Sequence, residues 1–319
     1  MSKKIRILSV LILCLVILCG CVNTGKTPTT TPAEVTESTI SPLLYKVTDN
    51  NGNVIWLFGS IHVGIDSYYP LPQYVTDAFS GSDALAVEVD IVRMELDLIG
   101  QFQYLGMLAY PDGSSLSEHI PAETYNRAVA ILEENGMYNA LLDKYMPAFW
   151  WSSIESLTYE KLDAKANLGI DRHLLKQARE QKKEIREVES AQFQYELMGS
   201  FSPELQLLLL ESAIDGYENL AETEDMVEEM MGLWAAGDEA AFSAYLSEEE
   251  DIPSEEAALY EEYNNSLITQ RNLSMTEYAV DALASGDEVF ICVGAAHIVG
   301  PGAMAENLRQ LGYTVELVN

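Results

Sequence analysis

Two stretches near opposite ends of the chain share one pattern: a continuous apolar run, then a glycine, then a histidine three positions later. Val54–Phe58 leads in this way to His62, and Val289–Val293 leads to His297. Continuous apolar runs of this length are typical of strands that are buried on both faces of a sheet. If the two strands lie side by side and parallel, both histidines lie at the same edge of the sheet. Open α/β sheets bind their ligands at that edge.

The rest of the hydrophobic pattern predicts more strands at the chain ends and helices between them. The further strands expected are Leu44–Thr48, Ala84–Asp90, Lys183–Glu189 and Tyr313–Val318. The helices expected are Pro72–Phe79, Met94–Met107, Pro121–Asn135, Tyr138–Leu162 with an interruption at Pro147, Arg172–Gln181 with Asp171 in the cap, Pro203–Ala284 with breaks at Gly216 and Gly237, and Gly302–Leu311. Proline near helix starts and glycine near helix ends support these limits.

The order of these elements predicts an α/β fold. Its central sheet is mixed, largely parallel and built from both chain ends, and a large helical insertion or lid spans about residues 94–284, interrupted by a short strand over about 184–188. This domain is expected to cover residues 43–319.

The first residues predict a targeting segment outside the fold. Met1–Arg6 is basic, and Ile7–Leu18 is apolar but too short for a comfortable transmembrane helix. Cys21 ends a segment that resembles a bacterial lipobox, so residues 1–20 are expected to be a lipoprotein signal peptide and Cys21 the lipidated residue. Residues 21–42 are rich in threonine and proline, which predicts a disordered tether. The alternative is an uncleaved N-terminal anchor, and both interpretations place the domain outside the cytoplasmic membrane.

The charge and the cysteine content narrow the range of possible functions. Fifty acidic residues against 18 basic ones give a net charge of −32, which argues against nucleic acid as a partner. The charge fits solubility or cationic partners. Cys292 is the only cysteine after Cys21 and lies within an expected core strand, so neither a disulfide framework nor a thiol nucleophile is expected.

Three residues at expected strand ends could hold a metal: His62, Glu88 and His297. Two imidazoles and a carboxylate are a usual ligand set for a divalent cation that keeps a position open for water. A bound metal makes that water a nucleophile at neutral pH, and a second carboxylate could accept its proton. The candidates for that role are Asp90, Glu187 and Glu189. The alternative is that the histidines are hydrogen-bonded structural residues.

Other polar residues carry weaker signals. His119 lies in a polar turn and is expected to be solvated, and His173 is expected on the first turn of a helix, solvated or partly packed. Arg271 and Asn272 precede an amphipathic helix, where a surface ion pair of about 0–1 kcal/mol is the simpler interpretation. The acidic run Glu248–Asp251 lacks the spacing of a calcium loop and is expected to be a solvated turn.

Several of these motifs together resemble the TraB/GumN family, which includes the Tiki proteases and is similar to the ChaN and erythromycin-esterase group. The matching segments are Trp56–Gly64, Tyr69–Pro72, Ala84–Asp90, Gly169–Leu175, Gln270–Asn272 and Val293–Tyr313. The resemblance implies a divalent-metal site at His62, His297 and Glu88. It also implies roles for the residues that match the family motifs around this site, which are Gly59, Gly294, Asp171, His173, Arg271 and Asn272.

The sequence therefore predicts a surface-anchored hydrolase that depends on manganese, cobalt or zinc and cleaves an extracellular peptide or protein. One alternative is a lipoprotein that binds a peptide or pheromone without cutting it, in a groove that Phe149, Trp150 and Trp151 could line, although aromatic residues after a proline are more typical of a core. The other alternative is a haem- or tetrapyrrole-binding protein. The oligomeric state is not predicted.

Overall fold

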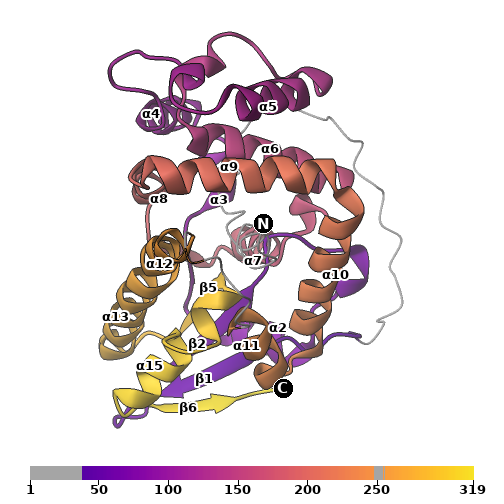
Figure 1. Ribbon diagram of the computed structural model, residues 1–319. Helices are drawn as coiled ribbons and strands as arrows, with labels where there is room; N and C mark the ends of the chain where they lie inside the picture. The colour runs from indigo at the N-terminus through magenta and orange to yellow at the C-terminus, as the bar shows by residue number, and fades with distance from the viewer. Residues whose placement is uncertain (1–37, 248–253, 255) are drawn as a thin grey trace.

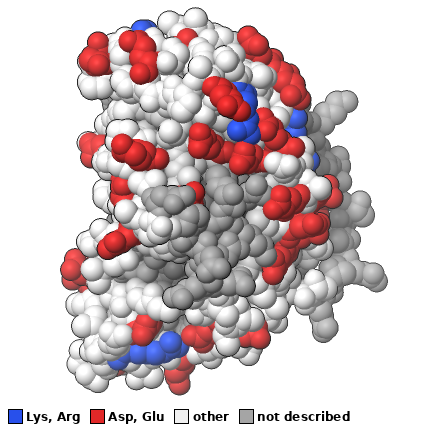
Figure 2. Space-filling view, in the orientation of Figure 1, with Lys and Arg blue, Asp and Glu red and all other residues white. Residues whose placement is uncertain are grey.

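A computed structural model describes residues 38–247, 254 and 256–319. The predicted signal peptide, the predicted lipidation site Cys21 and the acidic run Glu248–Asp251 lie outside the described residues. Within the described part, no helix combines the length and the apolar character needed to cross a membrane. On the face drawn in Figure 2, acidic side chains outnumber basic ones, in keeping with the charge of the sequence.

A six-stranded sheet forms the centre of the fold, as the sequence predicts. Its order is β4 (Glu184–Glu187), β3 (Ala84–Val87), β5 (Val289–Gly294), β2 (Val54–Ser60), β1 (Leu44–Thr48) and β6 (Thr314–Leu317). The four strands β4, β3, β5 and β2 are parallel, and β1 runs antiparallel to both of its neighbours. The predicted mixed, largely parallel α/β sheet is therefore confirmed, and strands from the two chain ends lie side by side in it.

The apolar runs of the central strands explain this arrangement. Every residue of β3 is buried, and β2 and β5 are almost wholly buried, because helices pack against the sheet (Figure 1). The helices that share the core of the sheet are α2 (Gln73–Gly81), α7 (Ile170–Gln181), α10 (Leu220–Ala236), α11 (Glu239–Ser247), α13 (Gln270–Ser285) and α15 (Met304–Gln310). Burial of continuous apolar strands in this way supplies most of the driving force for folding.

A second hydrophobic core lies within a layer of helices, which Figure 1 draws above the sheet. The layer contains α5 (Ala122–Glu134), α6 (Pro147–Lys161), α8 (Ala191–Gly199) and α9 (Pro203–Glu218). Trp150 and Trp151 are fully buried in it, and Phe149 is 3% exposed. These three aromatic residues therefore form the core of the helical layer and do not line a groove.

Several helix limits differ from the predicted ones. Residues 138–146 are not α-helical, because a proline starts α6 at residue 147 and the preceding backbone pairs instead with the loop at Ala109. Gly216 lies inside α9, and the break comes at Asn219. Ser190 caps α8, a helix that the pattern did not predict. The expected helix over residues 94–107 is two, α3 (Ile91–Met94) and α4 (Leu98–Met107), because Asp97 caps a new start.

The folded part begins before residue 43. Ile40 is buried, and the backbone N–H of Ser41 donates to the carbonyl of Ala235 at the end of α10. The described end of the predicted tether therefore packs against the domain, since an apolar side chain and a backbone hydrogen bond fix it there.

Candidate functional site

The ends of β2 and β5 bring the two histidines together. The strands are parallel neighbours, with Ser60 opposite Gly294, so the segments that follow them leave the sheet at the same edge. His62 lies just beyond β2, and His297 lies on the short helix α14 (Ala295–Ile298) that follows β5. Glu88 follows β3, the other neighbour of β5. Three strands thus place the three predicted residues at one edge.

The three side chains meet above Gly294. A Cβ atom at this glycine would lie 3.3 Å from Oε1 of Glu88, 3.6 Å from Cδ2 of His297 and 4.0 Å from Nε2 of His62. The predicted trio therefore converges on one small volume. Gly59 has a related role, because a Cβ there would lie 2.9 Å from Cα of Ala295. The absence of a side chain at residue 59 lets α14 approach β2.

His297 is held by Asn272. Its Nδ1 lies 2.7 Å from Oδ1 of Asn272, whose Nδ2 donates to the carbonyl of Gly302 at 3.0 Å. Because the amide oxygen faces the ring, Nδ1 of His297 carries the proton and Nε2 keeps its lone pair. Burial lowers the pKa of His297 to about 3, and the charge of Arg271 adds to this effect. The imidazole is therefore neutral at pH 7, the form that binds metals.

His62 is held by Asp171, whose Oδ2 lies 3.3 Å from Nδ1 of the ring. Asp171 lies in the first turn of α7, and the helix is capped by Gly169, so the predicted capping role of Asp171 is wrong. A Cβ at Gly169 would lie 2.4 Å from the carbonyl oxygen of His62. The start of α7 therefore lies directly against the backbone of His62. In this position the carboxylate of Asp171 faces the imidazole of His62.

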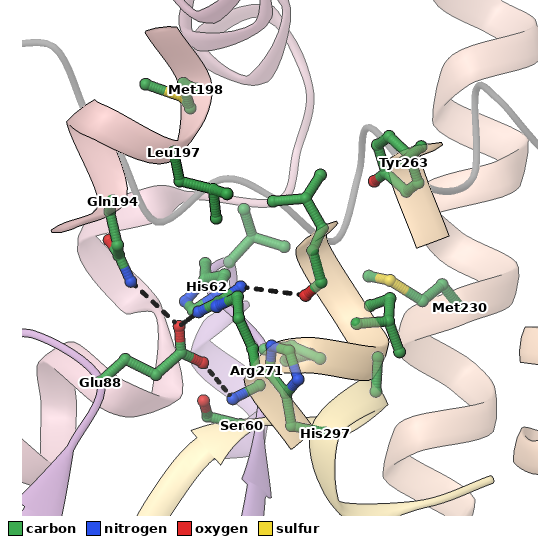
Figure 3. Close-up of a pocket in the computed structure, with 16 residues that line it drawn as sticks. Ser60, His62, Glu88, Gln194, Leu197, Met198, Met230, Tyr263, Arg271 and His297 are labelled. Atoms are coloured by element: carbon green, nitrogen blue, oxygen red, sulfur yellow. Dashed lines mark hydrogen bonds and ion pairs between the residues drawn. The ribbon is translucent and has the colours of Figure 1, made fainter. Parts of the chain in front are cut away.

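Glu88 is a buried carboxylate with three donors around it. Arg271 Nη2 lies 2.6 Å from Oε2, the N–H of Gly294 donates to Oε1 at 2.7 Å, and Nε2 of Gln194 lies 3.4 Å from Oε2 (Figure 3). Burial alone would raise the pKa of Glu88, but the Arg271 guanidinium, aided by the imidazoles and the Gly294 N–H, holds it well below its usual range. Glu88 is therefore ionised at neutral pH.

Arg271 bridges two acidic residues and is itself 8% exposed. Besides Glu88 it binds Glu189 through two contacts, Nε to Oε1 at 2.7 Å and Nη2 to Oε2 at 2.8 Å. The interpretation of Arg271 as a surface ion pair is therefore wrong. A π-helical turn, Asn265–Thr269, comes directly before α13. Such turns are frequent at functional sites, and this one ends two residues before Arg271, which reaches the site together with Asn272.

Three other predicted residues lie elsewhere. Asp90 binds Arg179 at 2.5 and 2.6 Å, and Glu187 binds Arg93 at 2.5 Å. These ion pairs tie the ends of β3 and β4 to α3 and α7, so neither carboxylate faces the histidines. His173 stacks on Tyr69 with ring centroids 4.3 Å apart, and burial lowers its pKa to about 4. His173 therefore packs between α7 and the loop after β2.

A pocket of about 760 Å³, open mouth included, lies over the three residues. Its floor is polar, and its wall toward the helices is largely apolar (Figure 3). The wall residues are Leu197, Met198, Met230, Tyr263, Leu267 and Ile268. They come from α8, from α10, from α12 (Ala257–Asn264) and from the π-helical turn. Sequence reasoning missed this wall, because its residues lie on separate helices and their spacing within each helix is that of an ordinary core.

The donor chemistry fits a divalent metal at the two imidazoles. In each ring Nδ1 is held by an oxygen of Asn272 or Asp171, the arrangement that orients metal-binding histidines. The carboxylate of Glu88 is already shared by Arg271 and Gly294. In the described ranges no three His, Cys, Asp or Glu side chains form a group that could hold a metal ion as they stand. The imidazole pair is therefore the part of the site that suits a metal.

Comparison with known proteins agrees with the motifs. The model of the TraB/PrgY/gumN family matches residues 43–317. The chain belongs to this family. The predicted resemblance is therefore confirmed over nearly the whole described domain.

The individual proteins that match this chain share only a low sequence identity with it. YbaP of Escherichia coli (strain K12) and YbaP of Shigella flexneri are each 27% identical over 254 residues, which cover 79% of this chain and 87% of theirs. The metalloprotease TIKI2 of Xenopus tropicalis is 22% identical over 305 residues, 82% of this chain and 57% of that protein. No solved structure matches. Family membership and the distant metalloprotease loosely support a hydrolase.

Proposed function

We propose that the protein is a divalent-metal-dependent hydrolase that cleaves peptide bonds. The observation that carries this proposal is the convergence of His62, His297 and Glu88 from three neighbouring strand ends on the space above Gly294. The similarity to a metalloprotease supports a metal-dependent reaction on a peptide bond. The two imidazoles would hold manganese, cobalt or zinc, and the carboxylate of Glu88 lies on the same side of Gly294 as both rings.

The chain's own residues organise this centre. When bound, the metal would supply an activated water and polarise the carbonyl of the substrate. Asn272 and Asp171 each engage Nδ1 of one imidazole, so Nε2 is the ring nitrogen that would bind the metal. Arg271 fixes the carboxylate of Glu88. Toward the metal, each of these three residues acts through a neighbouring side chain, so all three are positioning residues for the metal centre.

The pocket wall supports a peptide with apolar side chains as the substrate. Leucine, isoleucine and methionine side chains from the helical layer face the polar floor across the pocket. Flexible methionines adapt to apolar groups of different shape. A peptide bound between wall and floor would present its backbone to the histidines and its side chains to the helices.

Cleavage of an apolar peptide by metal-loaded protein tests the proposal. We expect His62→Ala and His297→Ala each to abolish cleavage, because each removes one imidazole, and excess chelator to do the same. The matched control is His173→Ala, since His173 is also partly buried but packs on Tyr69 away from the pocket. Cleavage that survives either pocket substitution, or that proceeds in chelator, contradicts the proposal.

A second candidate is capture of a peptide without cleavage. It is favoured by the apolar wall and by the contacts that already occupy both oxygens of Glu88. Mass spectrometry separates the two functions. Capture predicts an unchanged peptide mass after incubation with the metal-loaded protein, together with measurable affinity, whereas hydrolysis predicts two products.

We also propose that the domain is anchored outside the cytoplasmic membrane by lipid on Cys21. The support is the basic, apolar and lipobox-like order of residues 1–21. Cys21→Ser is expected to move the protein from the membrane fraction to the soluble fraction. Retention of this variant in the membrane would instead favour an uncleaved N-terminal anchor.

A further inference from the structure

Three buried oxygen atoms beside the histidines have no hydrogen-bond partner. They are Oγ of Ser60, Oδ1 of Asp171 and Oε1 of Gln194, on residues that are 2%, 9% and 5% exposed. All three residues line a second hollow of about 260 Å³, mouth included, which also borders His62 and Glu88. Buried polar atoms are almost always paired in proteins. Three unpaired atoms around one hollow therefore point to a ligand.

The amide of Gln194 cannot pair its oxygen by exchanging the oxygen and the nitrogen. Nε2 of Gln194 faces two carboxylates, Glu189 at 2.9 Å and Glu88 at 3.4 Å. Exchanging the amide oxygen and nitrogen would set an oxygen against both carboxylates, so Oε1 must remain the unpaired atom. Asp171 uses Oδ2 on His62 and keeps Oδ1 for another donor. The hollow thus offers acceptors and a negative charge.

A ligand that matches this hollow brings several N–H donors and a positive charge. A primary ammonium carries three donors and no acceptor, one for each unpaired oxygen. An ammonium bonds at about 2.8–3.0 Å to each oxygen, so it tolerates acceptors that are farther apart than metal ligands.

We propose that this hollow binds the α-ammonium of the substrate peptide, so that the enzyme removes residues from a free amino terminus. This inference rests on the proposed hydrolase function. The hollow and the larger pocket share Ser60, His62, Glu88 and Gln194. An amine bound in the hollow therefore lies next to His62 and Glu88, and in a peptide the first carbonyl belongs to the same residue as the amine.

The rest of the hollow is lined by apolar residues and leaves room for little beyond an ammonium group. Its remaining wall comes from the ends of β3 and β5 and from the start of α3. These residues are Val87, Val89, Ile91, Cys292 and Val293. In the reaction, the oxygen of water bonds to the carbonyl carbon of the first residue, and the bond from that carbon to nitrogen breaks. The first residue leaves as a carboxylate, and both hydrogens of the water end on the nitrogen of the shortened peptide.

Binding to chelator-treated protein, where no metal is available for turnover, tests the ammonium site. The probes are the tetrapeptide alanyl-leucyl-leucyl-alanine amide with a free amine and its N-acetylated form, titrated by calorimetry. The wild-type protein is expected to bind the free amine about tenfold to a hundredfold more tightly, the value of one or two charged hydrogen bonds. Asp171→Asn and the smaller change Ser60→Ala should each reduce this preference. Glu180→Gln removes an exposed carboxylate from the same helix and should leave the preference unchanged.

Equal affinity of the wild-type protein for the two peptides overturns the inference, and shows that the unpaired oxygens bind water only. Internal cleavage of the acetylated peptide at the rate of the free one also overturns it, and leaves the hydrolase proposal intact. If the wild-type protein prefers the free amine but the metal-loaded protein cleaves neither peptide, the result contradicts hydrolysis and supports the ammonium site.

Discussion

Replacing Arg271 with methionine would leave two buried carboxylates without their cation. Arg271 is the shared partner of Glu88 and Glu189, and all three side chains are less than one-tenth exposed. Removing one partner of a buried ion pair costs about 3–5 kcal/mol, because the remaining charge is poorly solvated. We expect Arg271→Met to lower the free energy of unfolding by that amount at pH 7. This is a large share of the roughly 5–15 kcal/mol typical of a domain.

The loss should shrink as the pH falls. In the wild-type protein, Arg271 holds the pKa of Glu88 below its usual range, so ionised Glu88 contributes stability above the pKa of the unfolded chain, about 4.3. In the variant, burial acts without that cation and raises the pKa of Glu88. The folded variant then binds a proton before the unfolded chain does, and acidification stabilises it. The difference between the two proteins is therefore largest at pH 7 and smaller at pH 5.

Urea unfolding followed by circular dichroism at pH 7 and pH 5 measures this difference. Arg127→Met is the matched control, because Arg127 also binds two carboxylates, Asp215 and Glu218, but on the surface with 32% of its side chain exposed. We expect the control to lose about 0–1 kcal/mol. Equal losses in the two variants, or a loss for Arg271→Met that does not shrink at pH 5, refute the reasoning. If Arg271→Met does not fold, Arg271→Lys keeps the charge and should show a smaller loss that depends less on pH.

Three further predictions follow from single contacts. Asn272→Leu removes the partner of Nδ1 of His297 and should lower metal affinity and kcat/KM about 10- to 100-fold while circular dichroism is unchanged; wild-type values would contradict the positioning role. His173 has a pKa of about 4 in the folded protein and about 6.5 when unfolded, so the wild-type protein should lose about 1–3 kcal/mol relative to His173→Gln as the pH falls from 6.5 to 4; parallel stability curves would contradict this. Gly59→Ala sets a methyl 2.9 Å from Cα of Ala295 and should cost about 1–3 kcal/mol in urea unfolding; unchanged stability would show that α14 moves freely.

The sheet could be predicted because its strands carry a strong local signal. The apolar runs of β2 and β5 are long enough to be strands and too uniform to be half exposed, so they had to be central. The histidine after each run then had to leave at a strand end. Which strands are neighbours is not encoded in the runs themselves. The pairing of β2 with β5 depends on contacts across more than 200 residues, and these appear only in the fold.

The surroundings of the histidines could not be predicted for the same reason. An arginine in so acidic a chain has many possible partners, and only the fold shows that Arg271 is buried between Glu88 and Glu189. A polar residue near a helix start usually caps the helix, yet Asp171 lies one position inside α7 and faces His62. Gln194 lies on a helix with no distinctive pattern, and its importance comes from the carboxylates around it.

Metal content is the most direct measure of whether the two chain ends build one metal centre. Purified protein is dialysed with manganese, cobalt or zinc, and bound metal is counted by elemental analysis for the wild-type protein, His62→Ala, His297→Ala and the control His173→Ala. We predict about one bound ion per chain in the wild-type protein and the control, and little or none in the other two variants. Metal that stays bound after either pocket histidine is removed, or a wild-type protein that binds none, would contradict the account.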